Sequence, residues 1–104
     1  GRSEEVRSLI NTNVNLNAKD NDGDTALICA AYYGHKACIK LLIDAGADLH
    51  VQNNGGDTAL IFAAYKGYKD CIKLLIDAGA DLDIQENDGK TAETVANEKH
   101  HTEI

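Results

Sequence analysis

The chain lacks proline, methionine and tryptophan altogether, and it has one phenylalanine among its 104 residues. It also lacks a long hydrophobic run. Apolar segments such as residues 39–43 are short and interrupted by lysine, whereas a membrane-spanning helix needs about 20 apolar residues. No charged and then apolar leader opens the sequence, so we expect a protein that is neither secreted nor anchored in a membrane.

Positive charge is scarce as well. Ten basic residues stand against seventeen acidic ones, which gives a formal net charge of −7. Binding to a nucleic acid needs a basic face that displaces counterions from the phosphates, and an anionic membrane surface also attracts basic segments. The charge therefore argues against nucleic acid and membrane partners and leaves a basic protein surface as a suitable one.

The three cysteines form neither a CxxC motif nor an even set. Disulfide frameworks of small secreted domains usually contain an even number of cysteines. Since Cys29, Cys38 and Cys71 depart from that pattern, we expect reduced thiols in a cytoplasmic protein. Hydrophobic residues make up 43% of the chain, which is enough for a packed core.

What the chain does have is a tandem repeat. Two consecutive blocks of 33 residues match at 25 of 33 positions without a gap. The period extends in both directions, because Thr25, Thr58 and Thr91 are 33 residues apart and Leu9 precedes Leu42 by the same distance. We therefore divide a single domain, residues 1–104, into a partial repeat, two whole repeats and a partial terminal repeat: residues 1–21, 22–54, 55–87 and 88–104.

Each whole repeat predicts two short helices and an extended connection. Thr25 is a predicted N-cap for an alanine-rich helix that ends at Gly34. A second helix is predicted over residues 36–45 and ends at Gly46, and residues 48–57 predict a β-hairpin-like turn. Helices of about eight residues are unstable alone, so stability must come from stacking each repeat on the next.

This pattern resembles the ankyrin repeat family over essentially the whole chain. The segments TALICA at residues 25–30 and TALIFA at residues 58–63 are similar to the family signature T-P-L-H-x-A. The pairs Gly34-His35 and Leu41-Leu42 also match the family pattern, as does GAD at residues 46–48. The resemblance implies an all-α solenoid of stacked helix-turn-helix units with β-hairpin-like loops.

The missing proline is one of two departures from that signature. Alanine stands in its place at residues 26, 59 and 92, which leaves the unfolded chain more freedom and costs about 0.4–1 kcal/mol per site. The signature histidine usually makes hydrogen bonds that brace the loop, and it is replaced by Ile28 and Ile61. We expect these isoleucines to pack in the core instead.

The terminal partial repeat is more polar than the others. Glu93 stands at the position of Leu27, and a polar residue on a stacking face is typical of a terminal capping repeat. Either the sequence is cut short within this repeat, or we expect the apolar side of the preceding helix, at Ile72, Leu75 and Ile76, to be left partly open. Such a surface would favour self-association through this C-terminal end.

No constellation of residues in the sequence predicts catalysis, a cofactor or a metal. Cys38 and Cys71 are repeat equivalents on an apolar stripe, and Cys29 shares its position with a phenylalanine, so all three are predicted in the core. The four histidines lack the spacing of metal ligands. The run Asp20-x-Asp22-x-Asp24 resembles the start of a calcium loop but has no glutamate at the twelfth position, which favours turn chemistry.

The resemblance also implies where a partner would bind, at the hairpin tips and the exposed face of each first helix. Tyrosine is common in binding hot spots because it offers a large contact area and a polar tip. Tyr32 and Tyr65 are repeat equivalents, so they are either binding or packing residues. The predicted partner-binding residues are Asp22, Asp24, Tyr32, Tyr33, Asn54, Asp57, Tyr65, Lys66 and Lys90.

We therefore expect a non-enzymatic module that binds a protein partner through its concave face and hairpin tips. The acidic loops indicate a partner with a basic or amphipathic surface. The alternative is an engineered or structural repeat scaffold with no natural ligand, because near-identical repeats arise from recent duplication and from consensus design alike. The three cysteines and the missing prolines are unusual choices for a designer.

Overall fold

The computed structural model describes residues 15–99 of the chain. Within this range it contains five α-helices and no strand: α2 (Ala26–Tyr33), α3 (Lys36–Asp44), α4 (Ala59–Lys66), α5 (Lys69–Asp77) and α6 (Ala92–Glu98). The predicted all-α solenoid is confirmed. The periodic residues upstream, including Leu9, lie outside the described residues, and so do residues 100–104.

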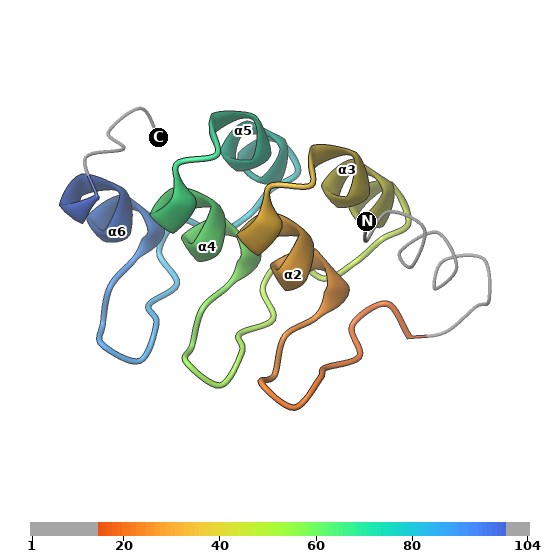
Figure 1. The fold of residues 1–104 in the computed structure, drawn as a ribbon, viewed down its shortest axis with the longest axis horizontal. Coiled ribbons are helices and arrows are strands. Elements are labelled where there is room, and N and C mark those ends of the chain that lie inside the picture. The colour runs from red at the N-terminus through yellow and green to blue at the C-terminus, as the bar shows by residue number, and fades with distance from the viewer. Residues whose placement is uncertain (1–14, 100–104) are drawn as a thin grey trace.

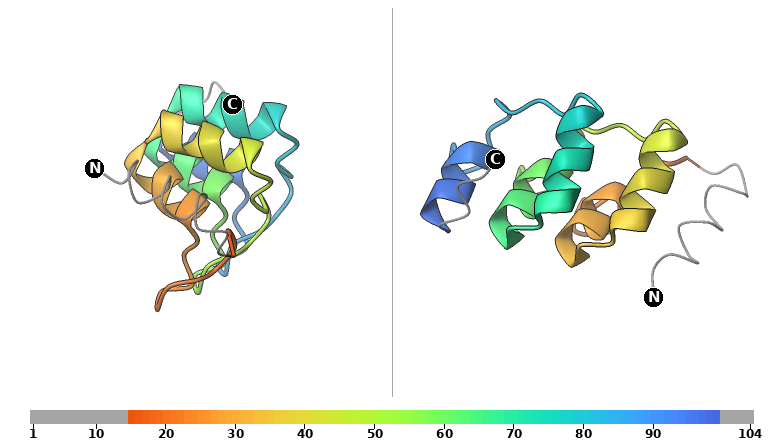
Figure 2. Two further views of the ribbon diagram at one scale, coloured as in Figure 1. Left: turned by 90° about the vertical axis from the view of Figure 1, so that its right-hand side faces the viewer. Right: turned by 90° about the horizontal axis from the view of Figure 1, so that it is seen from above.

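The helices form two rows, and the loops project from one of them. Helices α2, α4 and α6 pack side by side as an inner row, and α3 and α5 pack together as an outer row (Figures 1 and 2). The loops that precede α2, α4 and α6 lie next to one another and extend away from the helices (Figure 1). This arrangement places the loops and the inner helices on a common face.

Each inner helix begins at a threonine, as the repeat pattern predicts. The hydroxyl oxygens of Thr25, Thr58 and Thr91 each accept a hydrogen bond from the N–H three residues later, at 3.2–3.3 Å. Helices α2 and α4 end at Gly34 and Gly67, whose φ values of 70° and 73° are left-handed. The predicted caps are therefore confirmed at both ends of these short helices.

The inner helices begin in a backbone conformation that would accept a proline at the first helical residue. The capping threonines are extended, with ψ between 170° and 172°, which is the conformation that a residue before proline requires. The residue that follows each of them is the first helical one, whose N–H has no intrahelical partner. We expect Ala26→Pro, Ala59→Pro and Ala92→Pro each to raise the free energy of unfolding by about 0.4–1 kcal/mol. Chemical denaturation measures the effect, and a loss of stability would show that proline distorts these helix starts.

The core contains both small and large apolar side chains. Apart from the half-buried Ala26, the alanines of the inner helices are at most 1% exposed, which lets neighbouring helices approach closely. Ile28 and Ile61 are 1% and 3% exposed, so the predicted packing in place of the family histidine is confirmed. The largest fully buried hydrophobic side chains are those of Leu27, Ile28, Ile39, Leu42, Leu60 and Leu75.

The C-terminal end is more closed than the sequence indicates. Ile72 and Leu75 are 6% and 0% exposed, so the expectation that their apolar side is open is wrong. These side chains lie in the core cluster, where α5 packs against α3 and α4. Ile76 is half-buried. Helix α6 packs against α4 at the end of the inner row and turns Glu93 and Asn97 to solvent, as a capping repeat requires.

Hydrogen bonds with the period of the repeat join neighbouring loops. The main-chain N–H of Asn54 donates to the carbonyl of Asp22 and that of Asn87 to the carbonyl of Gly55, both at 3.0 Å. The side-chain amides of the same asparagines donate to the carbonyls of Asn21 and Asn54, at 3.1 and 2.8 Å. The loops therefore form a braced wall beside the inner helices.

Candidate partner-binding groove

The loop wall and the inner helices enclose two adjoining hollows. The first has a volume of about 280 Å³ and lies between the loop before α2 and the helix itself. The second has a volume of about 400 Å³ and lies over α4 and α6. Tyr32 and Phe62 line both, so the two hollows form one groove. The first is lined by Asp20, Asp22, Asp24, Ile28, Cys29, Tyr32, Tyr33 and Phe62.

Aromatic rings form one side of this groove. The Tyr32 ring packs edge-to-face against the rings of Tyr33 and Phe62, with centroids 5.0 and 5.3 Å apart. Tyr32, Tyr33 and Tyr65 remain 38%, 51% and 44% exposed. Each ring is thus held in place by neighbours while a large part of its surface stays accessible to another molecule.

Lysines from the next repeat lie over two of the tyrosines. The Nζ atom of Lys66 is 4.4 Å from the centroid of the Tyr32 ring and 5.9 Å from that of Tyr65. The Nζ atom of Lys99 is 4.7 Å from the centroid of the Tyr65 ring. These are cation–π distances, so the chain itself places a cation on the tyrosine of each preceding repeat.

The loop side of the groove is acidic because the turn chemistry favours aspartate. Oδ1 of Asp20 accepts the N–H groups of Asp22 and Asp24, both at 2.9 Å. The amide of Asn53 donates to Asp24 Oδ1 at 2.8 Å, and its own Oδ1 repeats the turn by accepting the N–H of Asp57. The predicted turn is therefore confirmed, and it aligns the acidic side chains along the groove.

One group in this loop has the donor types of a metal site. Asp20, Asp24 and Cys29 each place one ligand atom within 4.8 Å of the others. The Oδ1 atoms of both aspartates already accept hydrogen bonds from the loop or from Asn53. The turn thus accounts for this cluster without an ion.

The carboxyl group of Asp57 is partly buried and lies near three other acidic residues. Its pKa is raised above the ordinary value, first by partial burial and then by the negative charges of Glu86, Asp24 and Asp88. A raised pKa means that the negative charge of the carboxylate is unfavourable in these surroundings. Three neighbouring carboxylates therefore add to the effect of burial on the pKa of Asp57.

Neutralising Asp57 should stabilise the fold at neutral pH. The pKa of Asp57 in the native state lies above the reference value of 3.8, so the native state binds the proton more tightly than the unfolded state does. The free energy of unfolding therefore falls as the pH rises from 3.8 through the native pKa. We expect Asp57→Asn to raise the free energy of unfolding at pH 7 and to have no such effect below pH 3.8. Urea denaturation at both pH values tests this, with the exposed Asp83→Asn as the matched control; equal gains would contradict it.

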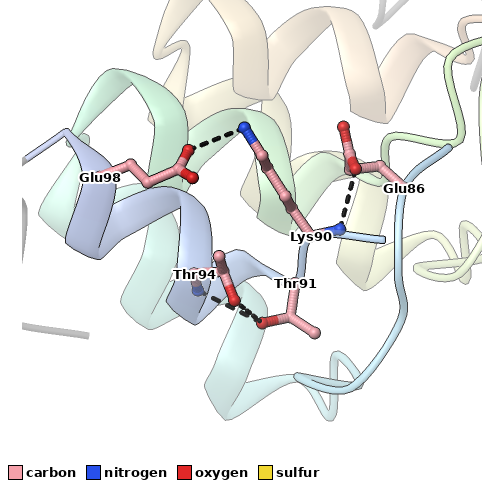
Figure 3. A network of polar contacts seen from close by, with 5 residues as sticks. All are labelled: Glu86, Lys90, Thr91, Thr94 and Glu98. Atoms are coloured by element: carbon pink, nitrogen blue, oxygen red, sulfur yellow. Dashed lines mark hydrogen bonds and ion pairs between the residues drawn. The ribbon is translucent and has the colours of Figure 1, made fainter. Parts of the chain in front are cut away.

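The third loop carries a lysine where the first two carry aspartate. Lys90 is the repeat equivalent of Asp24 and Asp57; its ammonium group lies 2.9 Å from Glu98 Oε2, and its N–H donates to Glu86 at 2.9 Å (Figure 3). The hydrogen bond and charge of Glu98 raise the pKa of Lys90, which keeps the ammonium group charged. The second hollow therefore contains cations of its own.

Most of the predicted partner-binding residues meet at the groove. Asp22, Asp24, Tyr32 and Tyr33 line the first hollow, and Tyr32, Asp57, Tyr65 and Lys90 line the second. Lys66 lies over the tyrosine rings. Asn54 lines neither hollow, because its side chain binds the neighbouring loop.

Sequence reasoning missed two residues of the groove. Cys29 was expected in the core, at a repeat position that it shares with Phe62, but both side chains are half-buried and line the groove, so that prediction is wrong for this position. Phe62 lies three residues before Tyr65 on α4, and this spacing places both on one helical face. That signal was available in the sequence. Cys38 and Cys71 are buried as predicted, at 0% and 2% exposure.

None of the helices in residues 15–99 combines the length and the apolar character needed to cross a bilayer. All three cysteines fall within this range, and none of them forms a disulfide there.

Comparison with known proteins agrees with this architecture. The family model described as "Ankyrin repeats (many copies)" matches residues 1–43, 29–76 and 62–104, which together span the whole chain. None of the curated proteins compared with the chain matches it. The overlapping matches follow the same succession of repeats that the helices and loops display. The chain belongs to the ankyrin repeat family.

Proposed function

We propose that this chain is a protein-interaction module whose partner binds in the groove between the loop wall and the inner helices. Ankyrin repeats are generally protein–protein interaction modules and are typically non-enzymatic. The observation that carries the proposal is the cluster of Tyr32, Tyr33 and Tyr65, which stays exposed beside the two hollows.

The exposure of these tyrosines favours a role in partner binding over a role in packing. A tyrosine has two side-chain torsions, so it loses little entropy when a partner covers it. Tyr33 is 51% exposed, and its repeat equivalent is Lys66, so an aromatic ring at this position is not required by the repeat. Tyr32 is the least exposed of the three tyrosines, at 38%, and it packs on Phe62. We therefore assign Tyr33 and Tyr65 to the partner first.

The charge of the groove supports a basic or amphipathic partner. The second hollow is lined by two lysines, Lys90 and Lys99, and by four acidic residues: Asp57, Glu86, Asp88 and Glu98. The first hollow is lined by three aspartates: Asp20, Asp22 and Asp24. Complementary charge speeds encounter and fixes the register of a complex. The aromatic rings supply the apolar contact that holds it.

The double variant Tyr33→Ala with Tyr65→Ala tests the proposal. Twelve-residue peptides selected from a random display library on the wild-type protein serve as partners. Each tyrosine should contribute more than about 1 kcal/mol, so the pair should raise the Kd by about 30-fold or more. Because both rings are largely exposed, the melting temperature should change little.

The matched control is Lys40→Ala with Lys73→Ala, which removes two equivalent exposed residues from the outer helices. It should leave peptide binding unchanged. A double tyrosine variant that unfolds would make the rings structural and defeat the assignment. A library that yields no peptide binding above background would support the alternative, a scaffold without a ligand.

The same samples test self-association near the C-terminal end. Leu82 is 41% exposed and follows α5, whose Ile76 is half-buried, so some apolar surface remains there. We propose that this patch supports association of the chain at high concentration. Light scattering that shows a monomer across the concentration range would refute it.

A further inference from the structure

The main chain at Asn54 and Gly55 takes part in both junctions of the loop wall. The N–H of Asn54 donates to the carbonyl of Asp22 in the preceding loop, at 3.0 Å. The carbonyl of Gly55 accepts the N–H of Asn87 in the following loop, also at 3.0 Å. The carbonyl of Asn54 accepts the side-chain amide of Asn87 at 2.8 Å. A change of covalent structure at this pair of residues would therefore disturb three loops at once.

The same pair is the one asparagine–glycine sequence in the chain. The side-chain amide of an asparagine can react with the main-chain nitrogen of the next residue, and a side chain on that residue hinders the approach. Glycine has no side chain, so it leaves its nitrogen accessible. The equivalent asparagines of the neighbouring loops, Asn21 and Asn87, are each followed by aspartate. All three asparagines are exposed, so the residue that follows them distinguishes Asn54 from the other two.

We propose that Asn54 is a site of spontaneous deamidation, and that opening of the loop wall controls the rate of this reaction. The main-chain nitrogen of Gly55 attacks Cγ of Asn54 and forms a C–N bond. The bond from Cγ to the side-chain nitrogen breaks, and that nitrogen leaves as ammonia with the proton of the Gly55 nitrogen. Water then opens the cyclic imide at either carbonyl, which gives aspartate or isoaspartate at residue 54. Water is consumed and ammonia is released in equal amounts, and nothing is oxidised or reduced.

The folded loop engages both groups that must react. The N–H of Gly55 donates to Asn53 Oδ1 at 3.0 Å, so its proton is held in a hydrogen bond. The side-chain amide of Asn54 donates to the carbonyl of Asn21 at 3.1 Å. The attack requires both bonds to break, because the Gly55 nitrogen has to lose its proton and approach Cγ of Asn54. Local opening of the loop therefore precedes the reaction.

Either product weakens the junction with the preceding loop. A carboxylate has no N–H to donate, so aspartate at residue 54 loses the bond to the carbonyl of Asn21 and places a negative charge beside that oxygen. Isoaspartate also routes the main chain through the former side chain, which moves the carbonyl of Gly55 away from Asn87. Deamidation would therefore loosen the loop wall, and the chain has no means of reversing it.

Mass spectrometry of tryptic peptides tests the proposal, because deamidation raises the mass of a peptide and water enriched in ¹⁸O marks the new oxygen. In guanidinium chloride, Asn54 should react about tenfold faster than Asn21 and Asn87, or more. In the folded protein the rate at Asn54 should fall by about tenfold or more, because the loop has to open first. Gly55→Asp, which copies the residue of the neighbouring loops, should suppress the reaction in both conditions.

Gly23→Ala should open the same junction from the preceding loop while the Asn54–Gly55 sequence stays intact. A Cβ atom on residue 23 would lie 2.6 Å from Asn54 Oδ1 and 2.8 Å from Asn54 N. Deamidation of Asn54 should therefore be faster in the folded variant and unchanged in guanidinium chloride. The matched control is Gly89→Ala, which has a similar φ of 82° but no atom of residues 15–99 within 4 Å of its Cβ. It should leave both rates unchanged.

The proposal fails if Asn54 reacts no faster than Asn21 and Asn87, or if its rate is the same in the folded and the denatured protein. It also fails if the two glycine variants, both shown to be folded by circular dichroism, react alike. The wild-type comparison decides between these results even if Gly23→Ala does not fold. Deamidated protein separated by ion exchange should unfold at a lower urea concentration than the unmodified protein. Equal midpoints would overturn the link between this modification and the loop wall.

Discussion

Replacing Gly56 with alanine should lower the free energy of unfolding by about 3 kcal/mol. Gly56 has a φ of 83°, where an L-residue is strained, and a Cβ atom there would lie 2.6 Å from Asn87 Oδ1 and 2.7 Å from Asn87 N. The main chain of Asn87 cannot yield without losing its hydrogen bond to Gly55. The backbone strain at residue 56 and the lost hydrogen bond between the loops therefore both lower the free energy of unfolding.

Gly89 offers a control that isolates the contact between loops. It occupies the same position of the next repeat, with a φ of 82°, but no atom of residues 15–99 lies within 4 Å of a Cβ built on it. Gly89→Ala should cost only about 1–2 kcal/mol from backbone strain. Urea denaturation of both variants measures the difference. Equal losses would mean that the loop wall contributes nothing beyond the conformation of its glycines.

Leu42→Ala should destabilise the protein by about 3–4 kcal/mol, a large part of the 5–15 kcal/mol typical of a domain. The Leu42 side chain is 0% exposed in the core, on a helix that packs against both α2 and α5. Truncation leaves a cavity at a junction of two repeats, and short helices depend on that junction because they are unstable alone.

The matched substitution for this experiment is Leu82→Ala. Leu82 is 41% exposed, so the same change of atoms creates no enclosed cavity and should cost well under 1 kcal/mol. Thermal and urea denaturation followed by circular dichroism compare the two. If Leu82→Ala proved as damaging as Leu42→Ala, the assignment of the core to the space between the helix rows would be wrong.

The sequence predicts the helices well because their signals are local. Thr25 and Thr58 act as caps, and Gly34 ends a helix, through bonds that span at most five residues. The period then fixes which faces stack. Ile28 was correctly placed in the core because an apolar side chain stands where the family signature has histidine.

The groove is less predictable because its contacts cross from one repeat to the next. Lys66 reaches Tyr32, and Lys99 reaches Tyr65, over 34 residues of sequence, and this depends on the offset between stacked helices. Phe62 was misplaced for a related reason. Its position on α4 faces the boundary between the inner row and the loops, where a residue is half-buried and hydrophobicity alone does not decide.

The three residues at the repeat position of Asp24 differ along the stack, and they give the groove a direction. Asp24 and Asp57 are followed by Lys90, so negative charge at one end meets a lysine–glutamate pair at the other. A bound peptide with its basic residues at one end would be attracted in one orientation, and its reversal would bring like charges together at Lys90. A nearly exact repeat, which presents almost the same surface in each copy, thereby distinguishes the two ends of a partner.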